Sequence, residues 1–391
     1  SQRPLARHRI VQQPPPATGT MTREAAYALL TSAGQPFELI EVEMFGRRCR
    51  AFKHAPPTLR ELYSTTRSGL PFIVYGEQRL SFEEAWQRAC QLAHALHDDY
   101  GVRKGDRVAI SLRNYPEWMI AFCAATSIGA IAVGMNALWQ PHEMEYALNH
   151  CGARVLFADQ ERLDRLRACR EVPAGLGVVA VRATGALPPG ARDFDEVLRA
   201  HAPADHMPPV DMHPNDDAIM FYTSDSTGHP KGAISSHRNI LSALLSWELD
   251  GHAAVLTGLV SAPVPGGPQP ATLLAIPLFH VTGLHAVYLS SYRTQRRLVS
   301  MYKWDTALAA ELIERERITS FIAPAAMTGD LVEAARSTGR DLSSLQTIGG
   351  GGAARAPEQV RAIDKVFANA QPATGWGMTE TNAIGTGIGG Q

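Results

Sequence analysis

The sequence predicts an α/β protein of two stacked αβ subdomains, with mostly parallel sheets flanked by helices and an incomplete β-barrel portion. Short apolar runs alternate with helical patterns along the chain, which is typical of βαβ units. These runs carry few charges, as expected of strands that are buried on both faces of a parallel sheet. The chain has 391 residues, of which 45% are hydrophobic and 19% are charged. This length and composition suit two or three packed units with a large core.

The first half of the chain shows the alternation in order. Ser81 and Glu84 form a capping-box pair and predict the start of a helix that ends near Gly101. Pro116 opens a second helix, and a third is expected at about 161–170. Apolar runs predict buried strands at 107–112, 130–134, 154–158 and 177–181.

A change of composition divides the chain in the middle. Residues 184–214 are rich in Pro, Gly, Ala and His, with one short helical piece at 194–198, and they predict a subdomain boundary. Beyond it we expect strands at 218–222, 273–277 and 318–323, and helices at 305–317 and 359–368. The predicted organisation is a disordered leader at 1–20, a first α/β subdomain at 21–190 and a second at 215–391.

Composition excludes several classes of partner. Lys and Arg number 37 against 38 Asp and Glu, a net charge of -1, so no overall field would attract nucleic acid. The five cysteines are widely spaced and form no C-x-x-C pair, which favours a reduced, cytoplasmic protein. The uncharged run at 119–135 is interrupted by Thr126, Ser127 and Gly129, and predicts a buried helix, a glycine stop and a strand rather than a transmembrane segment. The start of the chain lacks the apolar stretch of a signal peptide.

A loop rich in hydroxyl groups follows the strand expected at 218–222. Residues 223–232 read TSDSTGHPKG, with four hydroxyl side chains, two glycines and one lysine. Short donors, close backbone approach and one mobile cation are what a polyphosphate needs, so the loop predicts a nucleotide triphosphate site. It does not fit the Walker A pattern. The alternative is a Ser/Thr-rich loop that only closes a turn.

The loop resembles the phosphate loop of the adenylate-forming superfamily of acyl-CoA synthetases, luciferases and nonribosomal adenylation domains, normally [ST]-[ST]-G-[ST]-T-G-x-P-K-G. Three further motifs follow in the family's order: PLFH at 277–280, GGGA at 350–353 and WGMTE at 376–380. Upstream, LSF at 80–82, GDRV at 105–108 and NYPE at 114–117 also fit the family's large domain. The resemblance covers residues 58 to 391.

The resemblance implies a role for each matching residue. The β- and γ-phosphates would be held by the loop residues Thr223, Ser224, Ser226, Thr227, Gly228 and Lys231. Glu380, with Thr227, would carry Mg2+, and the Thr379 hydroxyl would reach the α-phosphate. Trp376 and Gly377 would face adenine, with Gly351, Gly352 and Ala353 along its edge. His280 would stand between the acyl site and the α-phosphate. The implied catalytic residues are therefore Lys231, Thr379, Glu380 and His280.

Each of these residues also has an ordinary structural interpretation. A single Trp or His is commonly a core residue, and Thr-Glu commonly opens a helix. Asp225 departs from the family, which has Gly there, and it adds a carboxylate to a loop that must hold polyphosphate. Residues 385–390 satisfy G-x-G-x-x-G, but no helix can follow them, so a Rossmann site is not expected.

The resemblance implies an ATP-dependent acid:CoA ligase with Mg2+ as cofactor and CoA as co-substrate. Small residues near the expected acid pocket, Ala323, Ala325, Ala326 and Gly350, favour a fatty or aryl acid, and we favour a fatty acid. The family's later S-T-G-D segment and small C-terminal domain are absent, so we expect a truncated chain that is impaired alone. Alternatives are an adenylation domain that charges a carrier protein and a catalytically degenerate nucleotide-binding protein. The sequence leaves the oligomeric state open.

Overall fold

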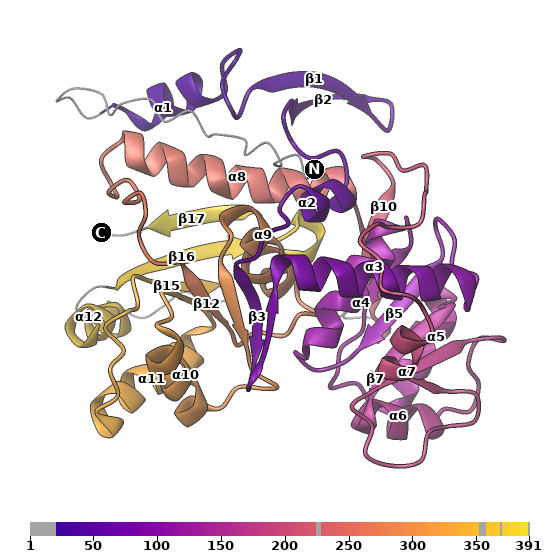
Figure 1. Cartoon of the computed structure of the whole chain (residues 1–391). Helices are drawn as coiled ribbons and strands as arrows, with labels where there is room; N and C mark the ends of the chain where they lie inside the picture. The colour runs from indigo at the N-terminus through magenta and orange to yellow at the C-terminus, as the bar shows by residue number, and fades with distance from the viewer. Residues whose placement is uncertain (1–20, 224–227, 352–356, 368–369, 390–391) are drawn as a thin grey trace, which may run out of the picture. The chain divides into compact units, whose positions relative to one another are not determined.

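The computed structural model describes residues 21–223, 228–351, 357–367 and 370–389. They form two compact units (Figure 1). The first unit contains the described residues up to His54 together with Leu245–Gly267, and the second contains Ala55–Leu244 and the described residues from Pro268 onward. The residues assigned to the phosphate loop and to the downstream motifs belong to the second unit.

The first unit contains a short helix and a hairpin. Helix α1 (Arg23–Leu30) begins after Thr22, whose hydroxyl accepts the Ala25 N–H at 3.2 Å. Strands β1 (Leu39–Met44) and β2 (Arg47–Phe52) pair antiparallel. The Phe37 ring packs edge-on against Phe52 and His252, with ring centroids 6.2 and 5.2 Å away, and forms the apolar centre of this unit.

The second unit contains two large sheets. Within the described ranges the first has seven strands in the order β11-β10-β6-β5-β7-β8-β9. Its strands are β5 (Arg107–Ser111), β6 (Ile131–Gly134), β7 (Val155–Asp159), β8 (Gly177–Val181), β9 (Arg192–Asp193), β10 (Asp217–Thr223) and β11 (Lys231–Ser236). All neighbouring strands are parallel except β10 and β11, which form an antiparallel hairpin at one edge.

Helices join and cover the strands of this sheet, as expected of an α/β fold: α4 (Pro116–Ser127) follows β5, α5 (Pro141–Cys151) follows β6, α6 (Gln160–Arg167) follows β7 and α7 (Phe194–Arg199) follows β9. Helices α2 (Leu59–Ser64) and α3 (Phe82–Asp98) pack on α4. Helix α8 (His237–Leu256) follows β11, and its residues from Leu245 onward belong to the first unit. The predicted capping box is present at α3, where Ser81 and Glu84 bond each other's backbone N–H at 3.0 Å. Helices α5 and α6 pack apolar residues onto strands β5 to β8.

The uncharged run at 119–135 has the predicted structure. Helix α4 is buried along almost its whole length and ends at Ser127, and Gly129 follows with φ of +79°. Strand β6 then continues into the sheet. Across the described residues, no helix is both long enough and apolar enough to cross a membrane.

The second sheet has eight strands among the described residues, in the order β17-β16-β15-β14-β12-β13-β3-β4. Its strands are β3 (Pro71–Tyr75), β4 (Gln78–Ser81), β12 (Ala271–Leu274), β13 (Arg297–Ser300), β14 (Ser320–Ile322), β15 (Thr347–Gly351), β16 (Gln371–Gly377) and β17 (Gly385–Gly389). The six strands from β16 to β3 run parallel. At one edge β17 pairs antiparallel with β16, and at the other edge β4 pairs antiparallel with β3. The described strands form no closed barrel.

Helices α10 (Thr306–Glu316), α11 (Ala325–Thr338) and α12 (Pro357–Val366) pack on this sheet. They lie together on one side of β12 and β15 (Figure 1). Two further helical segments follow β12: the π-helix η1 (Thr282–Leu289) and the short helix α9 (Ser290–Thr294). Residues 385–389 of the glycine-rich segment form strand β17.

Sheet membership does not follow the compositional boundary at 184–214. Strands β10 and β11 lie downstream of that boundary but join β6 in the first sheet. Strands β3 and β4 lie upstream but join β13 in the second sheet. The cause is long-range strand pairing, which local composition does not encode.

Candidate functional site

The downstream motifs follow strands that are parallel neighbours in the second sheet. PLFH comes after β12, the small residues Ala323 and Ala325 follow β14, and the glycine run ends β15. The WGMTE motif ends β16 and enters the next turn. Because the carboxyl ends of parallel strands meet at one edge, these segments are brought together there, which is where open α/β sheets bind ligands.

The phosphate loop connects the two strands of the β10–β11 hairpin. Thr223 ends β10 and lies opposite Lys231, the first residue of β11, with its hydroxyl 3.5 Å from the Lys231 carbonyl oxygen. Gly228 has φ of +99°, a conformation that favours glycine. The Lys231 side chain is exposed. Ser224, Asp225, Ser226 and Thr227 lie outside the described residues.

The turn after β16 is tightly folded. The short helix η2 (Thr379–Thr381) is followed by Asn382 and Ala383, both left-handed with φ of 54° and 63°. The Ala383 N–H donates to the Met378 carbonyl at 2.9 Å, and the Thr381 hydroxyl donates to the Ile384 carbonyl at 2.7 Å. A Cβ on Gly377 would lie 2.3 Å from the Ala383 carbonyl oxygen. The motif therefore requires glycine at 377 for a steric reason.

This turn, which we call the Thr379–Glu380 turn, packs against the strand that begins at Lys231. Strand β11 and helix η2 are in contact although they are far apart in the sequence. Strand β11 belongs to the first sheet, and η2 lies between β16 and β17 of the second. Glu380 is exposed and Thr379 is half-buried. A cationic side chain, a carboxylate and a hydroxyl are thus carried by two elements that are in contact.

His280 lies at the end of the PLFH segment, where a turn forms between its N–H and the Pro277 carbonyl at 3.1 Å. Its side chain is exposed, and partial desolvation by the surrounding chain lowers its pKa, which favours the neutral imidazole at pH 7. Gly283 packs tightly against this turn, since a Cβ there would lie 2.4 Å from the Pro277 carbonyl oxygen.

Asn114 fixes the PLFH segment to the first sheet. Its buried amide donates to the Ile276 carbonyl at 2.9 Å and accepts the Leu278 N–H at 3.0 Å. The backbone carbonyl of Asn114 accepts a hydrogen bond from the Ser300 hydroxyl at 2.5 Å. The NYPE motif marks this position, but no local pattern indicates that its first residue holds the strand end that leads to His280.

A stack of aromatic rings lies beside the phosphate loop. Tyr146 on α5 stacks on His229 of the loop and on His150, with centroid distances of 4.6 and 5.3 Å. His150 Nδ1 lies 2.9 Å from the hydroxyl of Tyr222, which precedes the loop on β10. Both ends of the loop are therefore anchored through helix α5.

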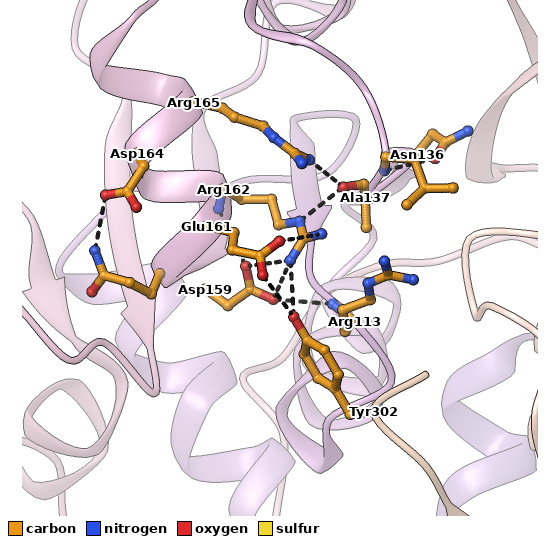
Figure 2. Close-up of polar contacts among 11 residues, drawn as sticks. Arg113, Asn136, Ala137, Asp159, Glu161, Arg162, Asp164, Arg165 and Tyr302 are labelled. Carbon is orange, nitrogen blue, oxygen red and sulfur yellow. Dashed lines mark hydrogen bonds and ion pairs between the residues drawn. The ribbon is translucent and has the colours of Figure 1, made fainter. Parts of the chain in front are cut away.

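A second polar cluster joins the carboxyl ends of β5, β6 and β7 in the first sheet (Figure 2). The buried Arg162 guanidinium pairs with Asp159 at 3.1 Å and donates to the Ala137 carbonyl at 2.9 Å. Asp159 also accepts the Arg113 N–H at 3.2 Å, and Tyr302 approaches Arg162 at 3.5 Å. The charge of Arg162 is balanced inside the cluster, which therefore serves to fix these strand ends.

The remaining predicted positions are only partly described. Gly351 ends β15 opposite Gly375 on β16, so the strands carrying the glycine run and Trp376 are direct neighbours. Gly352 and Ala353 lie outside the described residues, and for Trp376 only the backbone is described. Among the described residues no group of three or more His, Cys, Asp or Glu side chains could hold a metal by itself. The five cysteines are free.

The chain is similar to known proteins in sequence. The sequence profile of a family described as "AMP-binding enzyme" matches residues 63–390. The 4-coumarate–CoA ligase 3 of Oryza sativa subsp. japonica is 31% identical over 80% of this chain and 54% of that protein. The 4-coumarate–CoA ligase CCL1 of Humulus lupulus is 27% identical over 73% of this chain and 50% of that protein. The chain thus spans about half the length of these curated relatives.

Solved structures share the fold. The N-terminal domain of FACL13 from Mycobacterium tuberculosis superposes with a TM-score of 0.71 at 22% identity, covering 85% of this chain and 79% of that one. The anthranilate CoA ligase AuaEII, solved with anthranoyl-AMP, superposes with a TM-score of 0.72 at 24% identity, covering 84% of this chain and 61% of that one.

Proposed function

Because the chain belongs to the AMP-binding enzyme family, we propose that the protein activates a carboxylic acid with ATP and passes the acyl group to CoA. The carboxylate oxygen attacks the α-phosphorus, pyrophosphate leaves, and the CoA thiol then displaces AMP from the acyl adenylate. The observation that carries the proposal is the contact between the strand starting at Lys231 and the Thr379–Glu380 turn.

The residues have distinct roles in this proposal. Lys231, with the hydroxyl groups of Thr223, Ser224, Ser226 and Thr227, compensates the charge that builds on the leaving pyrophosphate. Thr379 contacts the α-phosphate. His280, neutral at pH 7, stands between the acid carboxylate and the α-phosphate without adding a charge.

Mg2+ suits the exposed carboxylate of Glu380, since this ion is commonly held by one or two carboxylates together with substrate phosphates. Thr227 is its proposed partner. When bound, the ion would neutralise phosphate charge. Glu380→Gln removes the carboxylate charge at nearly constant shape, so it should raise the Mg2+ concentration needed for adenylation, and Glu358→Gln on α12 is a matched control. An unchanged Mg2+ requirement would remove Glu380 from this role.

For the substrate we propose an apolar acid. The residues after β14 and Gly350 on β15 are small, which supports a fatty acid. The second candidate is an aryl acid, supported by the 4-coumarate–CoA ligases among the relatives. We also propose a cytoplasmic location.

Acid-dependent ATP–pyrophosphate exchange, run with acids from acetate to dodecanoate and with 4-coumarate, tests the proposal. Burial of about 0.8 kcal/mol per methylene would tighten binding nearly fourfold for each CH2 of a fatty acid. A flat response along the series with activity on 4-coumarate would favour the aryl acid. ATP binding without exchange for any acid is expected both of a chain that is impaired alone and of a degenerate nucleotide-binding protein, so acid-dependent exchange is the result that supports the proposal. Exchange that is followed by transfer to a carrier protein but not to CoA would favour the adenylation-domain alternative.

A further inference from the structure

A buried histidine joins two of the segments that form the candidate site. His285 is fully buried in η1, and its Nε2 lies 2.9 Å from Oδ1 of Asn382. Asn382 directly follows η2, which contains Thr379 and Glu380. An amide oxygen can only accept, so Nε2 carries the proton and donates it in this bond. The contact connects the helix that follows the PLFH segment with the Thr379–Glu380 turn.

The histidine is costly to bury. Nδ1 has no hydrogen-bond partner among the described residues. Burial lowers the pKa of His285 to about 4, so the ring is neutral at pH 7 and is held by its single bond to Asn382. An unpaired polar nitrogen in the interior costs free energy that a leucine would avoid. Packing alone therefore gives no reason for an imidazole at this position.

His285 lies in the π-helix η1, whose backbone carbonyl groups are bonded by side chains that follow it. The Ser290 hydroxyl donates to the His285 carbonyl at 2.9 Å, and Arg296 donates to the Ala286 and Val287 carbonyls at 2.9 and 3.0 Å. These side chains supply donors to carbonyl groups of the π-helical stretch. Such stretches are rare and often occur at functional sites.

The partner residue is equally constrained. Asn382 is 5% exposed and left-handed, a conformation that asparagine tolerates better than most residues. Its N–H donates to the Thr379 carbonyl at 3.1 Å. Movement of Asn382 would therefore move the backbone of Thr379.

We propose that His285 is a positioning residue that holds the Thr379–Glu380 turn in place for ATP through its hydrogen bond to Asn382. The inference rests on the proposed function, because it assigns the turn to nucleotide binding. His285 itself touches neither ATP nor the acid; it fixes how far the turn lies from the segment that carries His280.

Calorimetric titration of the chain with ATP and Mg2+, accompanied by thermal melts, tests the proposal. His285→Leu removes the donor and should weaken ATP binding about tenfold, which corresponds to about 1.4 kcal/mol. His285→Gln places an amide nitrogen near the position of Nε2, so it should restore affinity to within about threefold of the unmodified chain. Asn382→Gly keeps the left-handed backbone, removes the acceptor, and should match His285→Leu. It also serves if His285→Leu fails to fold.

The outcomes are separable. If the His285→Leu and Asn382→Gly variants melt at lower temperature but bind ATP as the unmodified chain does, the role is structural only and the inference is overturned. The inference is equally overturned if the His285→Gln variant binds as weakly as the His285→Leu variant. If the unmodified chain binds no ATP, the turn does not bind the nucleotide in this chain, and the inference is overturned whatever the variants do.

Discussion

Tyr146 on helix α5 stacks on His229 of the phosphate loop, with ring centroids 4.6 Å apart and an interplanar angle of 22°. The helix belongs to the cover of the first sheet, so this pair ties the loop to a rigid element. An aromatic pair of this kind contributes roughly 0.5–1.5 kcal/mol beyond its buried area.

The stack predicts that Tyr146→Ala weakens ATP binding several-fold, because the loop loses an anchor close to Lys231. Tyr146→Phe retains the ring and should bind ATP as the unmodified chain does. Titration calorimetry on the three proteins measures the difference. Equal ATP affinity for the Ala and Phe variants would show that the stack has no effect on the loop.

We expect a side chain at position 377 to distort the Thr379–Glu380 turn. Gly377→Ala would place a Cβ 2.3 Å from the Ala383 carbonyl oxygen, so the turn must shift. We expect a loss of about 1–3 kcal/mol in unfolding free energy, as for other overpacked positions, together with weaker ATP binding.

Gly251 on α8 is the matched control, since a Cβ there meets nothing within 4 Å. Gly251→Ala should stabilise the chain by up to about 1 kcal/mol, because alanine favours a helix interior. Urea unfolding of both variants checks the pair. Wild-type stability and ATP affinity in the Gly377→Ala variant would refute the steric argument.

We expect that replacing Asn114 destabilises the protein at the PLFH segment. Asn114→Ala leaves the Ile276 carbonyl and the Leu278 N–H without their side-chain partner. Each unpaired buried group costs about 1–3 kcal/mol, so the free energy of unfolding should fall by at least that amount. The exposed Asn149 on α5 is a control: its amide donates to the Glu145 and Glu171 carbonyls at 2.9 Å, but water can replace it there, so Asn149→Ala should cost about 1 kcal/mol or less. Similar losses for the two variants would contradict the assignment.

Two buried histidines predict how stability depends on pH. Burial lowers the pKa of His237 and of His285 to about 4, from an ordinary value of 6.5. Above pH 6.5 both rings are neutral in the folded and the unfolded chain, so the two histidines do not lower the free energy of unfolding. Between pH 6.5 and 4 only the unfolded chain takes up these protons, so stability falls as the pH falls, by up to about 1.4 kcal/mol per pH unit for each ring.

Denaturant unfolding at several pH values measures this slope. His285→Gln removes one titrating group and should flatten the slope by up to one proton. An unaltered slope in the His285→Gln variant would mean that His285 does not titrate as its burial implies.

Asp225 yields a prediction from charge alone, since it lies outside the described residues. A carboxylate about 5 Å from a phosphate charge, at an effective dielectric constant near 20, costs roughly 3 kcal/mol, part of which Mg2+ and Lys231 would screen. Asp225→Gly should therefore tighten ATP binding. If the carboxylate instead caps its own loop, the variant would lose stability while ATP affinity stays the same, and melts beside the titration separate the two cases.

The sequence by itself determined the local elements and the motifs. Apolar runs located β5, β6, β7 and β8, the capping box located α3, and Gly129 located the end of the run through α4. These features depend on residues close together in the chain, where periodicity, capping and the freedom of glycine act directly. Helices α5, α8 and α11 were not predicted from the local sequence pattern.

Only the tertiary structure decided which segments meet. Pairing of β10 with β6 and of β13 with β3 overrode the compositional boundary, because hydrogen bonding between strands depends on topology rather than on neighbouring residues. The same holds for the bonds of Asn114 to the PLFH segment and of His285 to Asn382. A buried asparagine and a buried histidine look alike in sequence whether they are core residues or supports of a site. Their partners became identifiable only when the two sheets brought distant strand ends within hydrogen-bond distance.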